Sequence, residues 1–158
     1  MSCSAGNLAV PLTACISTAN IHDPHMYDVL IESLAGLVSY VAADSIYSGK
    51  KLYHSSKEKG IVLVCPIKRY RHTKGERLER HHFFRSRKGQ RIIRKGGAIE
   101  RLFDRTKDTY RIESLAVRGY HNVSSYVLAC VFAYQVAIYY NCVVCRTRPQ
   151  CVKHMLGS

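Results

Sequence analysis

The stretch Ser39–Gly49 (SYVAADSIYSG) constrains the fold of this chain more than any other. A short apolar run, Tyr40 to Ala43, leads directly into a single acidic residue, Asp44, and a turn follows. Such a run, bounded by turn residues, predicts a buried strand. Open α/β sheets place their ligands at the carboxyl ends of their strands. Two roles are therefore open for the Asp44 carboxylate: it caps the following turn, or it binds a metal ion.

The rest of the chain alternates between predicted strands and helices, which indicates an α/β fold. A turn is expected at Gly6-Asn7, directly before the first strand. The predicted strands are Leu8–Thr18, the run that ends at Asp44, and Ile61–Ile67. The predicted helices are Asp23–Ala35, Lys50–Lys59, Ala98–Tyr110 and Val123–Val144. In the first helix, the residues expected on one apolar face are Met26, Leu30, Leu34 and Leu37.

The helix at Ala98–Tyr110 is expected to begin after a break at Gly96-Gly97. Its expected inner stripe is Ile99, Leu102, Phe103, Thr106 and Tyr110. Glu100, Asp104 and Lys107 share another face, at positions i, i+4 and i+7. From the spacing alone, this face is a solvent-exposed salt-bridge ladder or a functional group of residues.

Positive charge is concentrated in the basic segment, Lys68–Lys95, which holds twelve Lys or Arg residues against Glu76 and Glu79. Aromatic and histidine side chains are interleaved with these cations. The 158-residue chain has a formal net charge of +13, which makes a polyanion such as nucleic acid a natural partner. The segment is therefore a phosphate-binding surface or a solvated loop.

Seven cysteines are scattered through apolar runs, which is typical of a reduced intracellular protein and predicts a cytoplasmic location. The N-terminal residues MSCSAGNLAVPL do not have the pattern of a signal peptide. The tail contains a CxxC and a CxxH pair with zinc-like spacing. These residues are Cys142, Cys145, Cys151 and His154. Because the loop between the two pairs is only five residues long, we do not expect them to bind zinc.

The final apolar stretch, Val123–Val144, carries no charge and is long enough to cross a membrane. We expect a buried core helix instead, because the preceding β/α pattern needs a covering helix. Its tyrosines are also spread along the stretch and are not gathered at its ends, where membrane-spanning helices place them. A small membrane-anchored protein remains the alternative.

The order of these stretches resembles the C-terminal part of the catalytic domain of DDE transposases of the prokaryotic insertion-sequence type. The similarity covers roughly Gly6–Asn141. It rests on PLTACISTANIHD, VAADSIYSG, IVLVCPIKR, AIERLFDRTKDTYRI and the closing apolar helix. The combination of small-small-Asp-x-x-Tyr with a later Ile-Glu-Arg-x-Phe-x-x-x-Lys is fairly specific, although each half alone is weak.

The resemblance implies a ribonuclease-H-like fold, a mixed sheet with flanking helices, and three acids that hold two Mg²⁺ (or Mn²⁺) ions. By motif, the second acid falls on Asp44 and the third on Glu100. The implied activity is the cutting and joining of DNA by two-metal phosphoryl transfer. The implied domain is 1–141, with 68–95 as a basic insertion or loop and 142–158 as a cysteine-containing tail. The candidate DNA-binding residues are Lys68, Arg69, Arg71, Arg85, Arg87, Lys88, Arg91, Arg94 and Lys107.

The sequence also departs from the family pattern. No acid precedes Asp23, so we expect the first acid and the first strands of the fold to be absent. Ile93 and Gly96 stand where family members often place a Tyr and an Arg before the Glu. We also expect the N-terminal region that recognises DNA ends in such enzymes to be absent. The expectation is an inactive fragment, unless another copy or an upstream chain supplies the missing strands; the alternative is a non-catalytic, basic DNA-binding module.

Overall fold

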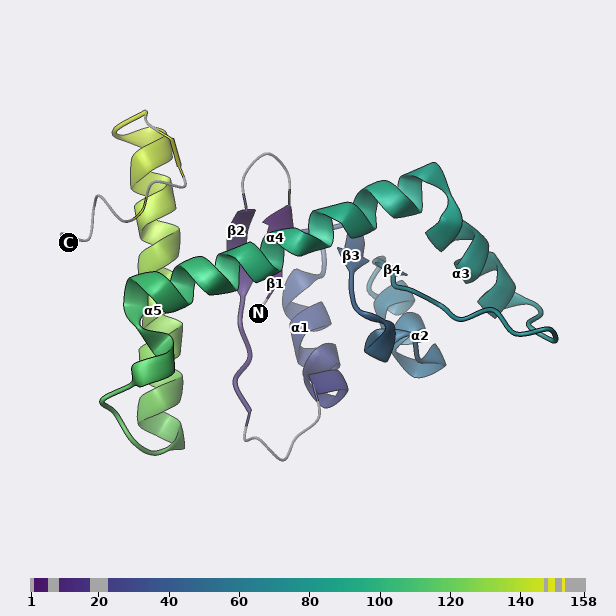
Figure 1. The fold of residues 1–158 in the computed structure, drawn as a ribbon, viewed down its shortest axis with the longest axis horizontal. Coiled ribbons are helices and arrows are strands. Elements are labelled where there is room, and N and C mark those ends of the chain that lie inside the picture. Colours follow the sequence, from purple (N-terminus) through teal and green to yellow (C-terminus); the bar gives the residue numbers. More distant parts are fainter. Residues whose placement is uncertain (1, 6–8, 18–22, 147, 150–151, 153–158) are drawn as a thin grey trace. The chain divides into compact units, whose positions relative to one another are not determined.

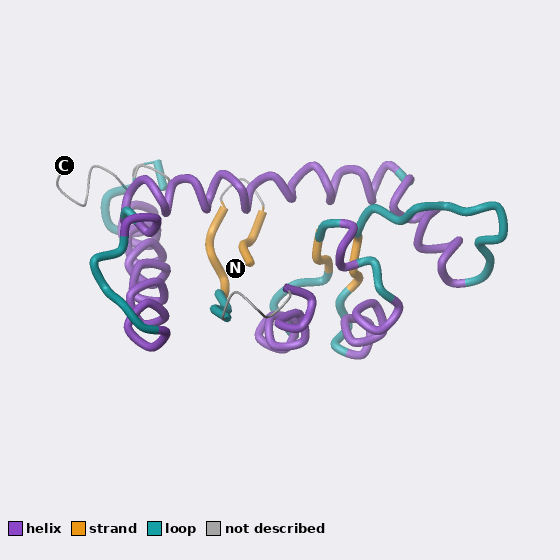
Figure 2. The backbone as a smooth tube through the Cα atoms, turned by 60° about the horizontal axis from the view of Figure 1, so that its bottom comes forward, coloured by secondary structure: helices purple, strands orange, loops and turns teal. Residues whose placement is uncertain are grey.

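The structure is a computed structural model that describes residues 2–5, 9–17, 23–146, 148–149 and 152. The chain folds as two compact units. The Asp44 unit is formed by residues 19–97, and the Glu100 unit by residues 1–18 and 98–158. The described residues contain five α-helices and four short strands (Figures 1 and 2), so the predicted mixed α/β class is confirmed.

The Asp44 unit contains a parallel strand pair, β3 (Tyr40–Ala42) and β4 (Val62–Val64). Parallel strands need a crossover connection, and α2 (Lys50–Glu58) provides it. The chain leaves α2 through Gly60, whose positive φ of 72° suits a residue without Cβ. The two strands and the crossover helix lie where the sequence predicted them.

Helix α1 (Tyr27–Leu34) follows a 3₁₀ turn at Asp23–Met26 and lies beside α2 (Figure 2). The predicted apolar face was partly correct. Leu34 is buried as predicted, but Tyr27 and Ile31 are buried in place of Met26 and Leu30. Leu37 lies beyond the helix and is 69% exposed. The Tyr27 hydroxyl hydrogen-bonds the Ser56 hydroxyl of α2 at 2.7 Å. Burial raises the pKa of Tyr27 to about 12. This buried phenol was not in the predicted stripe.

The basic segment is mostly helical, so the loop that the sequence left open as one alternative is wrong. It contains α3 (Glu76–Arg85) and the beginning of α4 (Arg87–Tyr110). Helix α4 also continues through Gly96-Gly97, where a break was expected. A glycine inside a helix costs about 1 kcal/mol relative to alanine, and the long flanking sequence outweighs that cost here.

The corner between α3 and α4 depends on Gly89. A Cβ atom at this position would lie 2.2 Å from the carbonyl oxygen of Phe83 and 2.7 Å from that of Phe84. We expect Gly89→Ala to destabilise the protein by about 1–3 kcal/mol through this overlap. The matched control is Gly96→Ala, whose Cβ would meet only the Cβ of Ala42 at 3.7 Å. Gly96→Ala should stabilise α4 by about 0.5–1 kcal/mol. If urea unfolding showed that both substitutions change the free energy of unfolding in the same direction, this geometry would be contradicted.

The Glu100 unit begins with an antiparallel hairpin, β1 (Ser2–Ala5) and β2 (Ala9–Thr13). The hairpin agrees with the predicted turn, although Gly6-Asn7 lie outside the described residues. Helix α5 (Tyr120–Val143) packs on β2, and the Gln135 amide donates a hydrogen bond to the Pro11 carbonyl at 2.8 Å.

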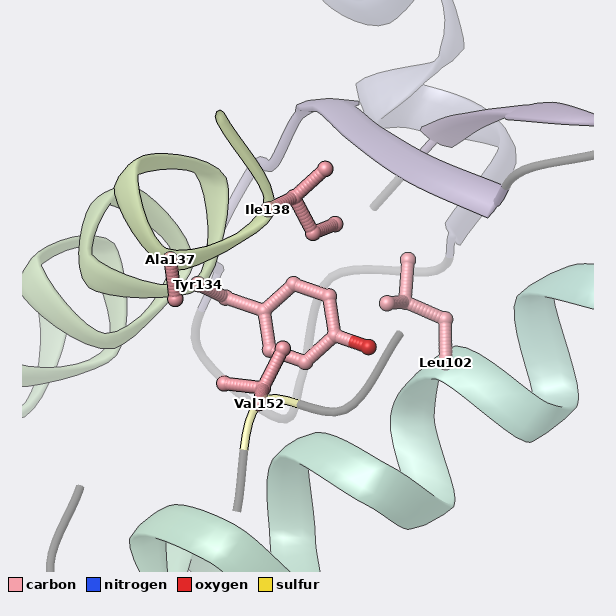
Figure 3. Close-up of a cluster of buried hydrophobic side chains, with 5 residues drawn as sticks. All are labelled: Leu102, Tyr134, Ala137, Ile138 and Val152. Atoms are coloured by element: carbon pink, nitrogen blue, oxygen red, sulfur yellow. The ribbon is translucent and has the colours of Figure 1, made fainter. Parts of the chain in front are cut away.

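The core of the Glu100 unit joins α4 to α5 around the ring of Tyr134, which is 1% exposed (Figure 3). The other members of this cluster are Leu102, Ala137, Ile138 and Val152. The predicted inner stripe of α4 was partly correct, because Leu102 and Thr106 are buried. Phe103, however, is 40% exposed, and Ala98 is buried in addition.

Helix α5 is buried along one face only, although a buried core helix was expected. Its buried residues are Cys130, Val131, Tyr134, Ala137, Ile138 and Asn141. The opposite face exposes large apolar side chains, among them Leu128, Phe132 and Tyr139. By length and composition, α5 is the one helix in the described ranges that could cross a membrane, and 33% of its most apolar window is buried.

Candidate functional site

Asp44 lies directly beyond the carboxyl end of β3 and is exposed. The strand ladder continues to Ala43, whose amide donates to the Val64 carbonyl at 3.0 Å. Asp44 itself is extended and caps the 3₁₀ turn Ser45–Tyr47, because its Oδ1 accepts a hydrogen bond from the Ser45 amide. Within the described part of the chain, Oδ2 has no such partner. The Asp44 carboxylate therefore caps the turn through one oxygen, and its other oxygen is available to bind a ligand.

The Asp44 turn, Asp44–Ser48, is closed by two backbone hydrogen bonds. The Tyr47 amide donates to the Asp44 carbonyl at 3.1 Å, and the Ser48 amide donates to the Ser45 carbonyl at 3.0 Å. The ring of Tyr47 lies 5.5 Å from that of Tyr27 on α1. The conformation around the Asp44 carboxylate is thus linked to the packing of α1.

Sequence reasoning did not identify Arg80, a residue of α3 that also contacts the Asp44 turn. Its Nη2 donates to the Ser48 carbonyl at 2.9 Å, and its guanidinium carbon lies 4.2 Å from the ring centroid of Tyr53 on α2. The thiol of Cys65 is a further hydrogen-bonding neighbour, and burial raises the pKa of this thiol. Arg80 is one of twelve cations in the basic segment, and nothing in the local sequence distinguishes it from the exposed ones.

Glu100 lies on α4 in the Glu100 unit and is exposed, as are Asp104 and Lys107. Ion pairs between described residues join Glu32 to Lys59, and Glu76 to His54 at 3.2 Å. Glu100 is in neither pair, so a salt-bridge ladder, one of the two alternatives for this helix face, does not include it. Its carboxylate remains accessible to a ligand.

Asp44 and Glu100 belong to different units. Carboxylate oxygens are the ligands that Mg²⁺ prefers, so the chemistry of both residues suits that ion. Among the described residues there is no group of three His, Cys, Asp or Glu side chains arranged for a metal ion. For zinc, Cys142 and Cys145 are free thiols, while Cys151 and His154 lie outside the described residues.

The candidate DNA-binding cations of the Asp44 unit are exposed and follow β4 or lie on α3 and the first turns of α4. They are Lys68, Arg69, Arg71, Arg85, Arg87, Lys88, Arg91 and Arg94. Two of them lie close enough to affect a neighbouring histidine: desolvation, and then the positive charges of His82, Arg69 and Arg85, lower the pKa of His81. Such a concentration of cations is suited to contact with a chain of phosphates.

Lys88 differs from the other cations because it is bound to the first residue of β3. Its Nζ donates to the Tyr40 hydroxyl at 2.5 Å and lies 4.6 Å from the centroid of that ring. The same ring stacks on Phe83 of α3, with the ring centroids 6.4 Å apart. These contacts attach the corner between α3 and α4 to the strand that ends at Asp44.

Comparison with known protein families found one model that matches most of the chain. The model describes a transposase DDE domain and matches residues 5–136, a range that includes Asp44, Glu100 and the whole basic segment. No curated protein and no solved structure matches the chain.

Proposed function

Because this chain belongs to the transposase DDE domain family, we propose that it is part of the catalytic domain of a DNA transposase and that Asp44 and Glu100 are two of its metal-binding acids. The observation that carries the proposal is the family match over residues 5–136, which contains both acids in the expected motifs. The exposure of both carboxylates supports it.

DNA cutting and joining is phosphoryl transfer, in which bound Mg²⁺ ions supply activation of the attacking oxygen and stabilisation of the leaving oxygen. The chain would contribute the ligands. Asp44 would use the oxygen that does not cap the turn, and Glu100 would use an exposed carboxylate on α4. Each ligand is thus presented by a regular element, a strand end for Asp44 and a helix for Glu100.

The fold that we propose is the ribonuclease-H-like fold of this family. The β1–β2 hairpin, the β3–α2–β4 unit and the two long helices α4 and α5 are the elements that support it. We further propose that residues 1–141 belong to this domain, with 68–95 as a helical basic insertion and 142–158 as a tail.

Two acids alone are a reduced ligand set for two-metal chemistry. Of the acids between Asp23 and Asp44, Asp28 accepts a hydrogen bond from Ser55 at 2.6 Å, and Glu32 pairs with Lys59. Both contacts link α1 to α2 or to the residue that follows it. We infer that Asp44 and Glu100 by themselves do not support two-metal strand transfer.

The proposed DNA contacts are the exposed cations of the basic segment and, in the Glu100 unit, Lys107 on α4. These cations also favour a second function, that of a basic DNA-binding module without catalysis. Both functions include salt-dependent binding to phosphates, so binding alone does not separate them.

The experiment that separates the two functions is strand cleavage by a full-length relative with all three acids. A transposase needs Mg²⁺ or Mn²⁺ and the carboxylates at the positions of Asp44 and Glu100. A binding module retains DNA in the presence of a chelator and does not nick it when metal is added. Cleavage that survives loss of either carboxylate would contradict the assignment.

A further inference from the structure

Arg80 is a buried cation, 9% exposed, and no carboxylate pairs with it in the part of the chain that the structure describes. Buried arginines are ordinarily paired with an acid, and arginine does not lose its proton in proteins. Its neighbours here are neutral: the Ser48 carbonyl, the Tyr53 ring and the Cys65 thiol. Packing alone does not explain why a charged residue occupies this position, because an apolar side chain of similar volume usually stabilises a core at least as well.

The contacts of Arg80 gather around the end of the Asp44 turn. Ser48 is held on both sides, since its carbonyl accepts from Arg80 at 2.9 Å while its amide donates to the Ser45 carbonyl at 3.0 Å. Ser45 in turn donates to the carboxylate of Asp44. A continuous series of hydrogen bonds therefore leads from the guanidinium to the carboxylate.

The guanidinium also fixes the position of its own helix. It presents several donors in one rigid plane and can stack on an aromatic ring at the same time. Arg80 uses both properties, with one donor on Ser48 and its face 4.2 Å from the Tyr53 ring centroid. Through these two contacts, Arg80 holds α3 against both α2 and the Asp44 turn.

We propose that Arg80 is a positioning residue that holds the Asp44 turn, and with it the Asp44 carboxylate, in the orientation that binds the metal ion. The inference rests on the proposed function, because it requires Asp44 to be a metal ligand. It also connects two parts of that function. Helix α3, which carries Arg80, belongs to the basic segment, so the DNA-binding surface and the metal ligand share one structural support.

The test uses the whole chain labelled with ¹⁵N and Mn²⁺ alone as the probe, because Mn²⁺ broadens the signals of nearby amides. Arg80→Met removes the donors, and Arg80→Lys keeps the charge but loses the planar fork. The matched control is Tyr27→Phe, which removes a buried hydrogen bond from the same unit and keeps the ring beside Tyr47. The amides of Ser45 and Ile46 report on the Asp44 carboxylate.

We expect the Mn²⁺ concentration that half-broadens these amides to rise roughly 10-fold in Arg80→Met, as for other residues that orient a metal ligand. Arg80→Lys should give a smaller increase, because an ammonium group cannot replace the fork. Tyr27→Phe should bind Mn²⁺ as the wild type does. Before Mn²⁺ is added, the amide shifts of Tyr47 and Ser48 should move in both Arg80 variants and stay in place in Tyr27→Phe.

If Arg80→Met does not fold, Arg80→Lys carries the test. Wild-type affinity for Mn²⁺ in a folded Arg80 variant would overturn the positioning role and leave the proposed function intact. Absence of broadening near Asp44 in the wild type would instead contradict the role of Asp44 as a ligand, and the inference would fail with it.

Discussion

Asp44→Asn or Glu100→Gln, introduced at the matching positions of a full-length relative, is expected to lower strand cleavage at least about 1,000-fold, which corresponds to about 4 kcal/mol of transition-state stabilisation. The amides keep the size of the side chains and remove the negative charge that holds Mg²⁺. The Asp44 turn should survive, because an asparagine side chain also accepts the capping hydrogen bond from residue 45. DNA affinity, measured on the same preparations, should remain at the wild-type level.

Asp104→Asn is the matched control for the loss of one acid from α4. Asp104 is exposed on the same helix as Glu100, and the family motif does not assign it to the metal. Its substitution at the matching position should leave cleavage unchanged. Equal loss in all three variants would show that the loss of a negative charge, and not of a metal ligand, determines the rate.

Replacement of Arg87, Arg91 and Arg94 together by glutamine is expected to weaken DNA binding by this chain and to flatten its salt dependence. The three exposed cations follow the i, i+4, i+7 spacing of one helix face. Each phosphate contact contributes about 0.9 to the slope of log affinity against log salt. Loss of three contacts should therefore reduce the slope by roughly 2.7, as measured by fluorescence anisotropy of a short duplex at several salt concentrations.

The control for this experiment replaces Lys50, Lys51 and Lys57 by glutamine, which removes the same number of positive charges. These three residues are exposed cations of α2. If the basic segment is the DNA surface, the control should have a much smaller effect on the slope. Equal effects of the two triple variants would mean that DNA responds only to the net charge of the chain.

The sequence was sufficient to predict the elements that surround Asp44. The strands β3 and β4 are short apolar runs between turn residues, and α2 ends near a glycine with positive φ. These are local properties of the chain, so local patterns predicted them. The position of Asp44 at a strand end followed from the same patterns.

The features that depend on tertiary contacts were predicted less well. The buried face of α1 is set by Tyr27, whose hydroxyl finds Ser56 on another helix. Helix α4 continues through Gly96-Gly97 because its neighbouring turns support it, whereas the local pattern indicated a break. Helix α5 is apolar all round, so its sequence could not indicate which face packs on the hairpin.

Arg80 illustrates why the candidate site was only partly predictable. Asp44 and Glu100 were identified by motif, but a residue that orients a ligand has no pattern of its own. Its role depends on a carbonyl 32 positions away in the sequence and on the face of Tyr53. Such contacts become visible only once α3 is placed against α2.

The central claim, that Asp44 and Glu100 are metal ligands, is tested most directly by Mn²⁺ titration of the ¹⁵N-labelled chain. The account predicts that Mn²⁺ broadens the amides next to Asp44 and the amides next to Glu100. It also predicts that Asp44→Asn removes the broadening around residue 44 and that Glu100→Gln removes the broadening around residue 100. Broadening that is absent at either residue, or that survives the loss of the carboxylate there, would contradict the claim.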